Sequence, residues 1–210
     1  TEDLSEVTPI DSPDQLDADI LTNEDSDTEI GKALILYAFG MDANNSWRYP
    51  YYTAEKTTLD NLGLTTTIDS AVTVQDFKDN LDDNYDVISF SMHGSYYTNK
   101  PVLCTNDITS KDEDTTYSGD LKSKRIVKVT LADGLSYYWI MPDFFDAYYD
   151  SDSMEDTYIY MENCDGFGEK GTVDYSLADG LIENGAECVI GFHNSVLANY
   201  CRNMFFDTID

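Results

Sequence analysis

Basic residues are scarce in this sequence. Its 210 residues include 12 Lys and Arg against 41 Asp and Glu, which gives a formal net charge of −29. A field of this sign repels nucleic acid and anionic membrane surfaces, so neither is an expected partner. A cationic peptide would instead be attracted, although salt screens the attraction beyond about 8–10 Å.

Cysteine is also infrequent, and long apolar runs are missing. The four cysteines, Cys104, Cys164, Cys188 and Cys201, are too few to form the disulfide framework of a domain this size. No Cys-x-x-Cys pair or other metal-ligand spacing occurs. Cys188 lies in an apolar run, which indicates a small core residue. No stretch of 18 uncharged apolar residues is present, so we expect no transmembrane helix.

The first 30 residues differ from the rest in composition. They are rich in Asp, Glu, Ser and Thr and contain Pro9 and Pro13. Such a segment has little apolar area to offset the entropy of ordering, so we expect a solvated leader or linker. A propeptide is the alternative. Residues 31–210 are enough for one domain with a substantial core, which the 16 Tyr residues also favour.

Apolar runs and helical patterns alternate along the first half of that domain. The predicted order is strand, helix, strand, helix, strand, over Lys32–Phe39, Tyr51–Leu62, Leu64–Ile68, Thr73–Leu81 and Tyr85–Met92. This alternation predicts parallel strands with helices on both faces of the sheet.

The second half begins with residues 95–121, which are polar and are predicted to form a loop. Two apolar runs, Arg125–Leu131 and Leu135–Met141, then flank Asp133-Gly134, a strong signal for a β-hairpin. The remaining predicted elements are a strand ending near Glu162, a helix over Tyr175–Ile182, a strand over Ala186–Phe192 and a helix over Leu197–Ile209.

Two of the predicted strands end in reactive side chains. The strand that starts at Tyr158 stops before Cys164, and Gly166 and Gly168 allow the chain to turn sharply afterwards. The strand that starts at Tyr85 runs directly into His93. Open α/β sheets bind ligands at the carboxyl ends of their strands, so a thiol and an imidazole there can form a nucleophile and its base.

Three segments carry a resemblance to a known group of enzymes. They are Ser91-Met92-His93-Gly94, Met161-Glu162-Asn163-Cys164-Asp165-Gly166, and residues 177–191. In this order they resemble the caspase-like cysteine peptidases, closest to the bacterial clostripain-like and gingipain-like members. The resemblance spans about residues 32–196. It implies a three-layer α/β/α sandwich with a mostly parallel central sheet, an inserted β-hairpin and no cofactor. It also implies further C-terminal elements that residues 31–210 would lack.

The resemblance also implies roles for individual residues. Cys164 would be the nucleophile and His93 the base, with the backbone N–H groups of Gly94 and Cys164 stabilising the oxyanion. Glu162 shares a strand face with Cys164 and would line the pocket for the residue before the scissile bond. An acid there favours Lys or Arg, or an amide side chain if other groups dominate the pocket. A solvated or backbone-capping Glu162 is an equal alternative.

Two further side chains are candidates for substrate binding. Trp47 follows the first predicted strand and would either line the cleft or pack over the core. His193 ends a strand as His93 does, which makes it both a candidate substrate-binding residue and the rival base.

Calcium is a further candidate partner. Asp150-x-Asp152 has the opening spacing of an EF-hand loop, but Glu155 occupies the position that requires Gly. A solvated charged loop is therefore the simpler interpretation. Some members of the resembled group bind calcium, so calcium remains a candidate partner for which no ligands are assigned.

The sequence therefore predicts a cysteine endopeptidase with a Cys-His dyad and a preference for a basic residue before the scissile bond. The main alternative is a catalytically inactive caspase-like scaffold that acts as a surface binding module. A thiol acyltransferase is a third hypothesis. The acidity, the polar leader and the resemblance favour a bacterial protein that is secreted or displayed at the cell surface.

Overall fold

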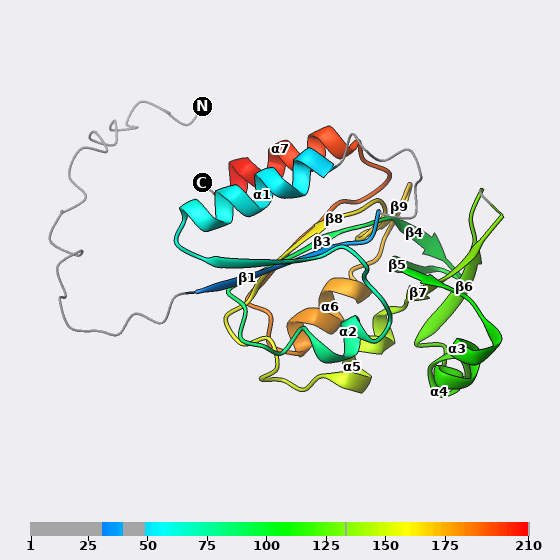
Figure 1. Cartoon of the computed structure of the whole chain (residues 1–210). Helices are drawn as coiled ribbons and strands as arrows, with labels where there is room; N and C mark the ends of the chain where they lie inside the picture. The colour runs from blue at the N-terminus through cyan, green and yellow to red at the C-terminus, as the bar shows by residue number, and fades with distance from the viewer. Residues whose placement is uncertain (1–30, 40–48, 133, 210) are drawn as a thin grey trace, which may run out of the picture.

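The computed structural model describes residues 31–39, 49–132 and 134–209 (Figure 1). The leader, Trp47 and Asp133 lie outside these ranges, so the predictions made for them stay untested. Within the described residues, no helix is both long and apolar enough to cross a membrane.

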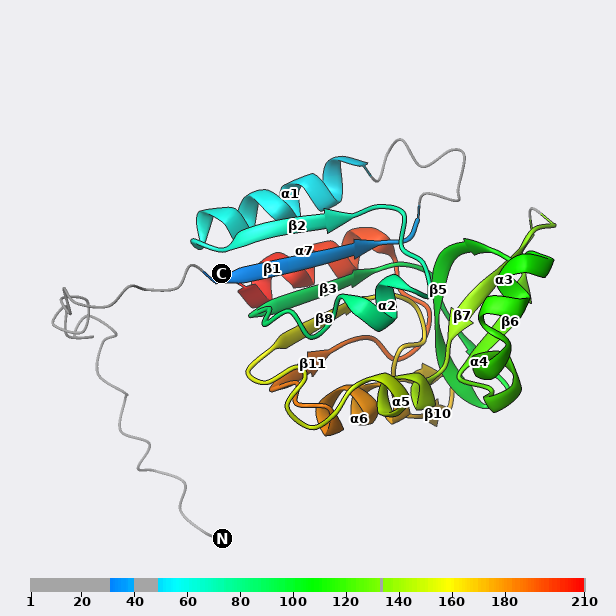
Figure 2. The same cartoon turned by 60° about the horizontal axis from the view of Figure 1, so that its bottom comes forward.

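A five-stranded parallel sheet forms the centre of the molecule. Its strands are β1 (Lys32–Tyr37), β2 (Thr65–Asp69), β3 (Val87–Ser91), β8 (Tyr158–Glu162) and β11 (Cys188–Ile190). They lie in the order β11-β8-β3-β1-β2, and every neighbouring pair is parallel (Figure 2). The inner strands β1 and β3 are buried almost throughout, as expected for a sheet covered on both faces. The predicted α/β class with a mostly parallel sheet is confirmed.

Helices cover both faces of this sheet (Figure 1). On one face lie α1 (Tyr49–Asn61) and α7 (Ala198–Ile209). On the other lie α2 (Asp76–Asp79), α5 (Phe145–Tyr148), which continues from the 3₁₀ turn η3 (Pro142–Phe144), and α6 (Ser176–Glu183).

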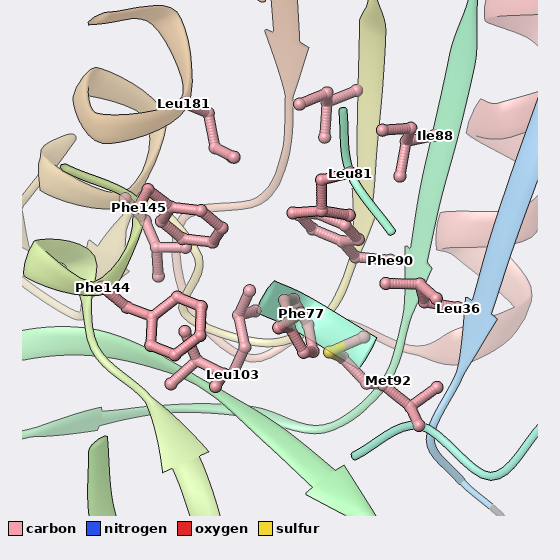
Figure 3. Packing of buried hydrophobic residues seen from close by; sticks show 14 of the residues in the cluster. Leu36, Phe77, Leu81, Ile88, Phe90, Met92, Leu103, Phe144, Phe145 and Leu181 are labelled. Atoms are coloured by element: carbon pink, nitrogen blue, oxygen red, sulfur yellow. The ribbon is translucent and has the colours of Figure 1, made fainter. Parts of the chain in front are cut away.

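Strand alternation divides the core between these two faces. Ala33 and Ile35 of β1 pack toward α1 and α7 with Phe205, whereas Leu36 of β1 points to the opposite layer. In that opposite layer, Leu36, Ile88 and Phe90 meet residues from α2, η3, α5 and α6 (Figure 3). The labelled partners there are Phe77, Phe144, Phe145 and Leu181. The aromatic contact Phe77–Phe90 fastens α2 to the sheet, and the contact Phe77–Phe144 joins α2 to η3, with ring centroids 5.6 and 6.4 Å apart.

A second, antiparallel sheet lies beyond the carboxyl ends of the parallel strands (Figure 2). Its strands are β4 (Gly94–Tyr97), β5 (Lys100–Ile108), β7 (Ser136–Ile140) and β6 (Ile126–Thr130), in the order β4-β5-β7-β6. Strands β6 and β7 pair antiparallel from Ile126↔Ile140 to Thr130↔Ser136.

The loop predicted over residues 95–121 is therefore wrong. Most of β4 and β5 and the helices α3 (Lys111–Thr116) and α4 (Ser118–Ser123) occupy this range. The polar composition of this range suggested a loop, but polar side chains of β5 are buried and form hydrogen bonds within the protein. Thr105, for example, is fully buried and donates its hydroxyl to the Tyr138 carbonyl at 2.8 Å.

A buried ionic cluster joins helix α4, next to the second sheet, to helices α2 and α5 on the parallel sheet. Asp120 of α4, only 3% exposed, lies 2.7 Å from Lys78 Nζ and 2.8 Å from Arg125 Nε. Tyr148 of α5 donates its hydroxyl to the same carboxylate at 2.7 Å. Burial alone would raise the pKa of Asp120, but the hydrogen bonds from Lys78 and Tyr148 and the neighbouring cations hold it below its ordinary value.

Three smaller predictions need correction. The helix expected over Thr73–Leu81 is a single turn, α2, although Thr73 accepts the Asp76 N–H at 3.2 Å as a capping residue would. Cys188 is only half-buried on the edge strand β11 instead of in the core. Residues 168–173 form a short hairpin of β9 (Gly168–Glu169) and β10 (Thr172–Val173) that the sequence analysis did not predict.

Candidate active site

The positions of His93 and Cys164 follow from the register of two neighbouring strands. Ser91 at the end of β3 pairs with Glu162 at the end of β8. His93 and Cys164 each follow two residues later, so they leave the sheet at the same level. Ser91 Oγ donates to Glu162 Oε2 at 2.6 Å, which puts these two side chains on the same face, and alternation directs the residues two further on to that face.

The thiol and the imidazole line one small cavity of about 40 Å³. This volume has room for only a few water molecules. The residues that line the cavity are Phe39, Met92, His93, Glu162, Asn163, Cys164, Val196, Ala198 and Cys201. The structure therefore brings together the nucleophile, the base and the specificity residue that the sequence predicts.

Aromatic packing orients the His93 ring. Phe39, which follows β1 and is buried, meets the imidazole edge-on with ring centroids 4.8 Å apart and an angle of 83° between the planes. On the main-chain side, the His93 carbonyl accepts the Cys104 N–H at 2.9 Å, which pins the strand end to β5.

Gly94 allows the two strand ends to approach each other. A Cβ atom at this position would lie 2.1 Å from the Cys164 carbonyl oxygen and 3.0 Å from Asn163. Only glycine fits such a contact with backbone.

The Gly94 N–H is not used in pairing with β5. Because Cys104 N–H bonds the His93 carbonyl, the opposed residues Gly94 and Leu103 form a non-hydrogen-bonded pair of the antiparallel ladder. The Gly94 N–H is therefore directed away from β5, at the edge of the second sheet. Among the residues that the structure describes, no backbone oxygen accepts the Cys164 N–H.

Cys164 is half-buried and is held against the segment that precedes α7. Its sulfur accepts the Val196 N–H at 3.5 Å, and the thiol lies 3.7 Å from the Val196 carbonyl. The next residue, Asp165, has a φ of 57° and donates its N–H to the Asn194 carbonyl at 3.0 Å. The turn after β8 is therefore anchored to residues 194–196, a contact that the sequence analysis did not predict.

Glu162, on the cavity wall, forms a buried pair of carboxyl groups with Glu55. Glu162 is 5% exposed and Glu55 of α1 is 1% exposed. Ser89 donates its hydroxyl to Glu55 at 3.4 Å. Burial raises the pKa of Glu55 well above its ordinary value, and the charge of Glu162 and the hydrogen bond between the two carboxyl groups raise it further. Glu55 therefore holds its proton more tightly than a solvated glutamate does, and Glu162 is not the solvated residue that the alternative interpretation proposed.

His193 is not brought to the thiol. It is exposed, its Nε2 lies 3.1 Å from the Thr172 carbonyl, and its Nδ1 lies 2.9 Å from Asn194 Nδ2. It does not line the cavity that contains Cys164. The geometry therefore favours His93 over His193 as the base.

The acidic loop before β8 shows internal hydrogen bonding. Asp150 accepts the Asp152 N–H at 3.3 Å and the Ser153 hydroxyl at 3.1 Å. Among the residues placed in the structure, no three His, Cys, Asp or Glu side chains gather closely enough to hold a metal ion. Calcium binding stays an unassigned prediction.

Comparison of the sequence with models of protein families finds no match, and comparison with curated proteins finds none either.

Proposed function

We propose that this chain is a cysteine endopeptidase of the caspase-like group, with Cys164 as its nucleophile and His93 as its base. One observation carries the proposal. The two residues follow paired positions of neighbouring parallel strands, Ser91 and Glu162, and line the same cavity. A thiol nucleophile requires a base within reach, and the two groups often sit farther apart before substrate binds.

The arrangement of the chain supports the caspase-like assignment. The strand that precedes His93 and the strand that precedes Cys164 are adjacent in the parallel sheet. The antiparallel strands β4 to β7 all come between them in the sequence, where the resemblance implies an inserted hairpin.

The proposed reaction uses groups that surround the cavity. His93 takes the proton of Cys164, and the sulfur attacks the carbonyl carbon of the peptide bond. His93 then donates this proton to the leaving amine, which leaves a thioester on Cys164. Water hydrolyses the thioester, with His93 again accepting a proton. The carboxylic acid product departs and restores the free thiol.

The developing negative charge on the carbonyl oxygen needs preorganised donors. The N–H of Gly94 is directed away from β5, and the N–H of Cys164 belongs to the nucleophile itself. Main-chain donors of this kind are each worth about 10²–10³ in rate. The close contact between Gly94 and Cys164 fixes the two donors relative to each other.

Glu162 favours a Lys or Arg before the scissile bond. Its carboxylate lies on the cavity wall, where Ser91 holds it at 2.6 Å. The net charge of −29 attracts the same cationic substrates. A cavity of about 40 Å³ is smaller than a Lys side chain, so binding has to widen it at the Val196 and Ala198 wall.

Cleavage of a peptide library tests the proposal. The wild-type chain should cleave peptides, with products enriched in Lys or Arg at the new carboxyl terminus, and Cys164→Ala should cleave none. Cys188→Ala is the matched control, because Cys188 is also half-buried but lies outside the cavity. Equal cleavage by wild type and Cys164→Ala would rule the proposal out.

The same experiment separates the alternatives. A scaffold predicts no cleavage by any variant and no labelling of Cys164 by a thiol-directed electrophile. An acyltransferase predicts that an added amine is incorporated into the product in place of water.

A further inference from the structure

Two thiols share the cavity. Cys201 lines it together with Cys164, and its volume of about 40 Å³ keeps every group on its wall close to the others. The other two cysteines lie elsewhere. Cys104 packs in the second sheet beside Trp139. Cys188 begins β11 and pairs with Tyr158 at the start of β8, whereas Cys164 follows the end of β8.

Cys201 is held firmly at this wall. It lies in the first turn of α7 and is 1% exposed. Its N–H donates to the Leu197 carbonyl at 3.1 Å, and its carbonyl accepts the Tyr160 hydroxyl. Tyr160 precedes Cys164 by four residues on the same strand face, so this bond fixes α7 directly behind the nucleophile.

The two thiols differ in how an incoming reagent meets them. Cys164 is half-buried and borders a cavity that also contains an imidazole. Burial, followed by the negative charge of Glu162 and the proximity of Cys164, raises the pKa of Cys201 far above that of an ordinary thiol. Cys201 therefore stays neutral and shielded, and a small oxidant reaches Cys164 first.

We propose that Cys201 is a resolving thiol, which closes a disulfide with Cys164 after a hydroperoxide has oxidised it. In the first step, the Cys164 sulfur attacks one oxygen of hydrogen peroxide. An S–O bond forms, the O–O bond breaks, and Cys164 becomes a sulfenic acid while water leaves. In the second step, the Cys201 sulfur displaces the hydroxyl group, and the thiol proton departs with it as a second water. Two thiols and one peroxide give one disulfide and two waters.

The segment before α7 links the turn that carries Cys164 to the helix that carries Cys201. A disulfide needs its two Cα atoms about 4.4–6.8 Å apart. Residues 191–197 form no helix or strand, and they connect β11 to α7 past the Cys164 sulfur. A small rearrangement there can move the Cys164 turn, which Asn194 and Val196 anchor, while the Tyr160 bond keeps Cys201 in place.

The disulfide would protect the nucleophile. A sulfenic acid with no partner is oxidised further to a sulfinic acid, which is irreversible in most proteins, whereas a disulfide returns to two thiols on reduction. This role does not depend on peptide cleavage, so it can be tested separately from the proposed peptidase activity.

Mass spectrometry of the peroxide-treated full chain tests the proposal. Wild type should yield a cross-linked peptide joining Cys164 and Cys201, two hydrogens lighter than its reduced parts, and dithiothreitol should restore alkylation of both thiols. Cys201→Ala should yield sulfinic acid at Cys164 instead, and Cys188→Ala should behave as wild type.

Two results would overturn it. One is a Cys201 that stays fully alkylatable in denatured wild-type chain after Cys164 has been oxidised. The other is sulfinic acid at Cys164 forming at the same rate in wild type and Cys201→Ala. If Cys201→Ala does not fold, the presence or absence of the Cys164–Cys201 cross-linked peptide in wild type decides the proposal on its own.

Discussion

Gly94 and the carbonyl of Cys164 are packed so closely that a Cβ atom at position 94 would lie 2.1 Å from the Cys164 oxygen. The residue after the proposed base thus touches the backbone of the proposed nucleophile. This contact fixes the distance between the ends of β3 and β8, and every proposal about the cavity depends on it.

Gly94→Ala should therefore be damaging. The added methyl group meets backbone that cannot move aside, so we expect a loss of about 1–3 kcal/mol or more in the free energy of unfolding. Labelling of Cys164 by a thiol-directed electrophile should change as well. Gly119→Ala is the control, because its Cβ has only Arg125 within reach, at 3.9 Å, and helix α4 accommodates alanine. Urea unfolding measures both variants, and equal stability of the two would contradict the contact.

Asp120→Asn should weaken the link between the second sheet and the parallel sheet. It leaves Lys78 and Arg125 without the buried carboxylate that both approach within 2.8 Å. Breaking a buried pair by removing one partner typically costs about 3–5 kcal/mol. Asp82→Asn, at an exposed position, should cost little. Urea unfolding compares the two, and a loss for Asp120→Asn no larger than that of the control would show that the cluster is not structural.

Glu55 should make stability fall as pH rises. The folded chain raises the pKa of Glu55 above the ordinary value of 4.5, so between these two values the folded state binds more protons than the unfolded state. The stabilisation from this proton is complete below the ordinary pKa and is lost as pH rises through the folded one. Glu55→Gln keeps the hydrogen bond to Glu162 and should flatten this dependence.

Thermal unfolding between pH 4 and pH 8 measures the effect. The exposed Glu183→Gln should retain the wild-type slope. A Glu55→Gln variant whose slope matches wild type would show that folding does not raise the pKa of Glu55.

Phe39→Leu tests whether the edge-on contact at 4.8 Å orients the His93 ring. The smaller side chain leaves the imidazole free to turn, so we expect kcat for a cleaved peptide to fall about tenfold with little change in KM. A change confined to KM would indicate that Phe39 contacts substrate instead.

Much of the fold could be predicted from the sequence because the parallel strands are buried on both faces. The run that starts at Lys32 is continuous and apolar up to Phe39, and Tyr85–Met92 is mostly apolar, so both leave few alternatives to a central strand. The meeting of His93 and Cys164 followed from the same rule, since parallel strands bring their carboxyl ends to one edge.

The features that the sequence analysis missed depend on contacts between distant segments. Glu55 has the spacing of a buried helix face, with Tyr52 and Leu59 on either side, yet an acid at such a position is explained only by its partner Glu162. The position of Cys201 behind Cys164 depends on how α7 crosses β8, which no local pattern specifies. Only half of the second sheet, β4 and β5, was missed, because β4 is short and half-exposed, although the buried run from Val102 to Cys104 was a usable signal.

The rate at which iodoacetamide alkylates Cys164, followed against pH in wild type and in His93→Ala, tests the central claim most directly. If the imidazole takes the proton of this thiol, wild-type Cys164 should react near pH 6–7 at least about tenfold faster than in His93→Ala, and His193→Ala should match wild type. Superimposable pH–rate profiles for wild type and His93→Ala would contradict the dyad.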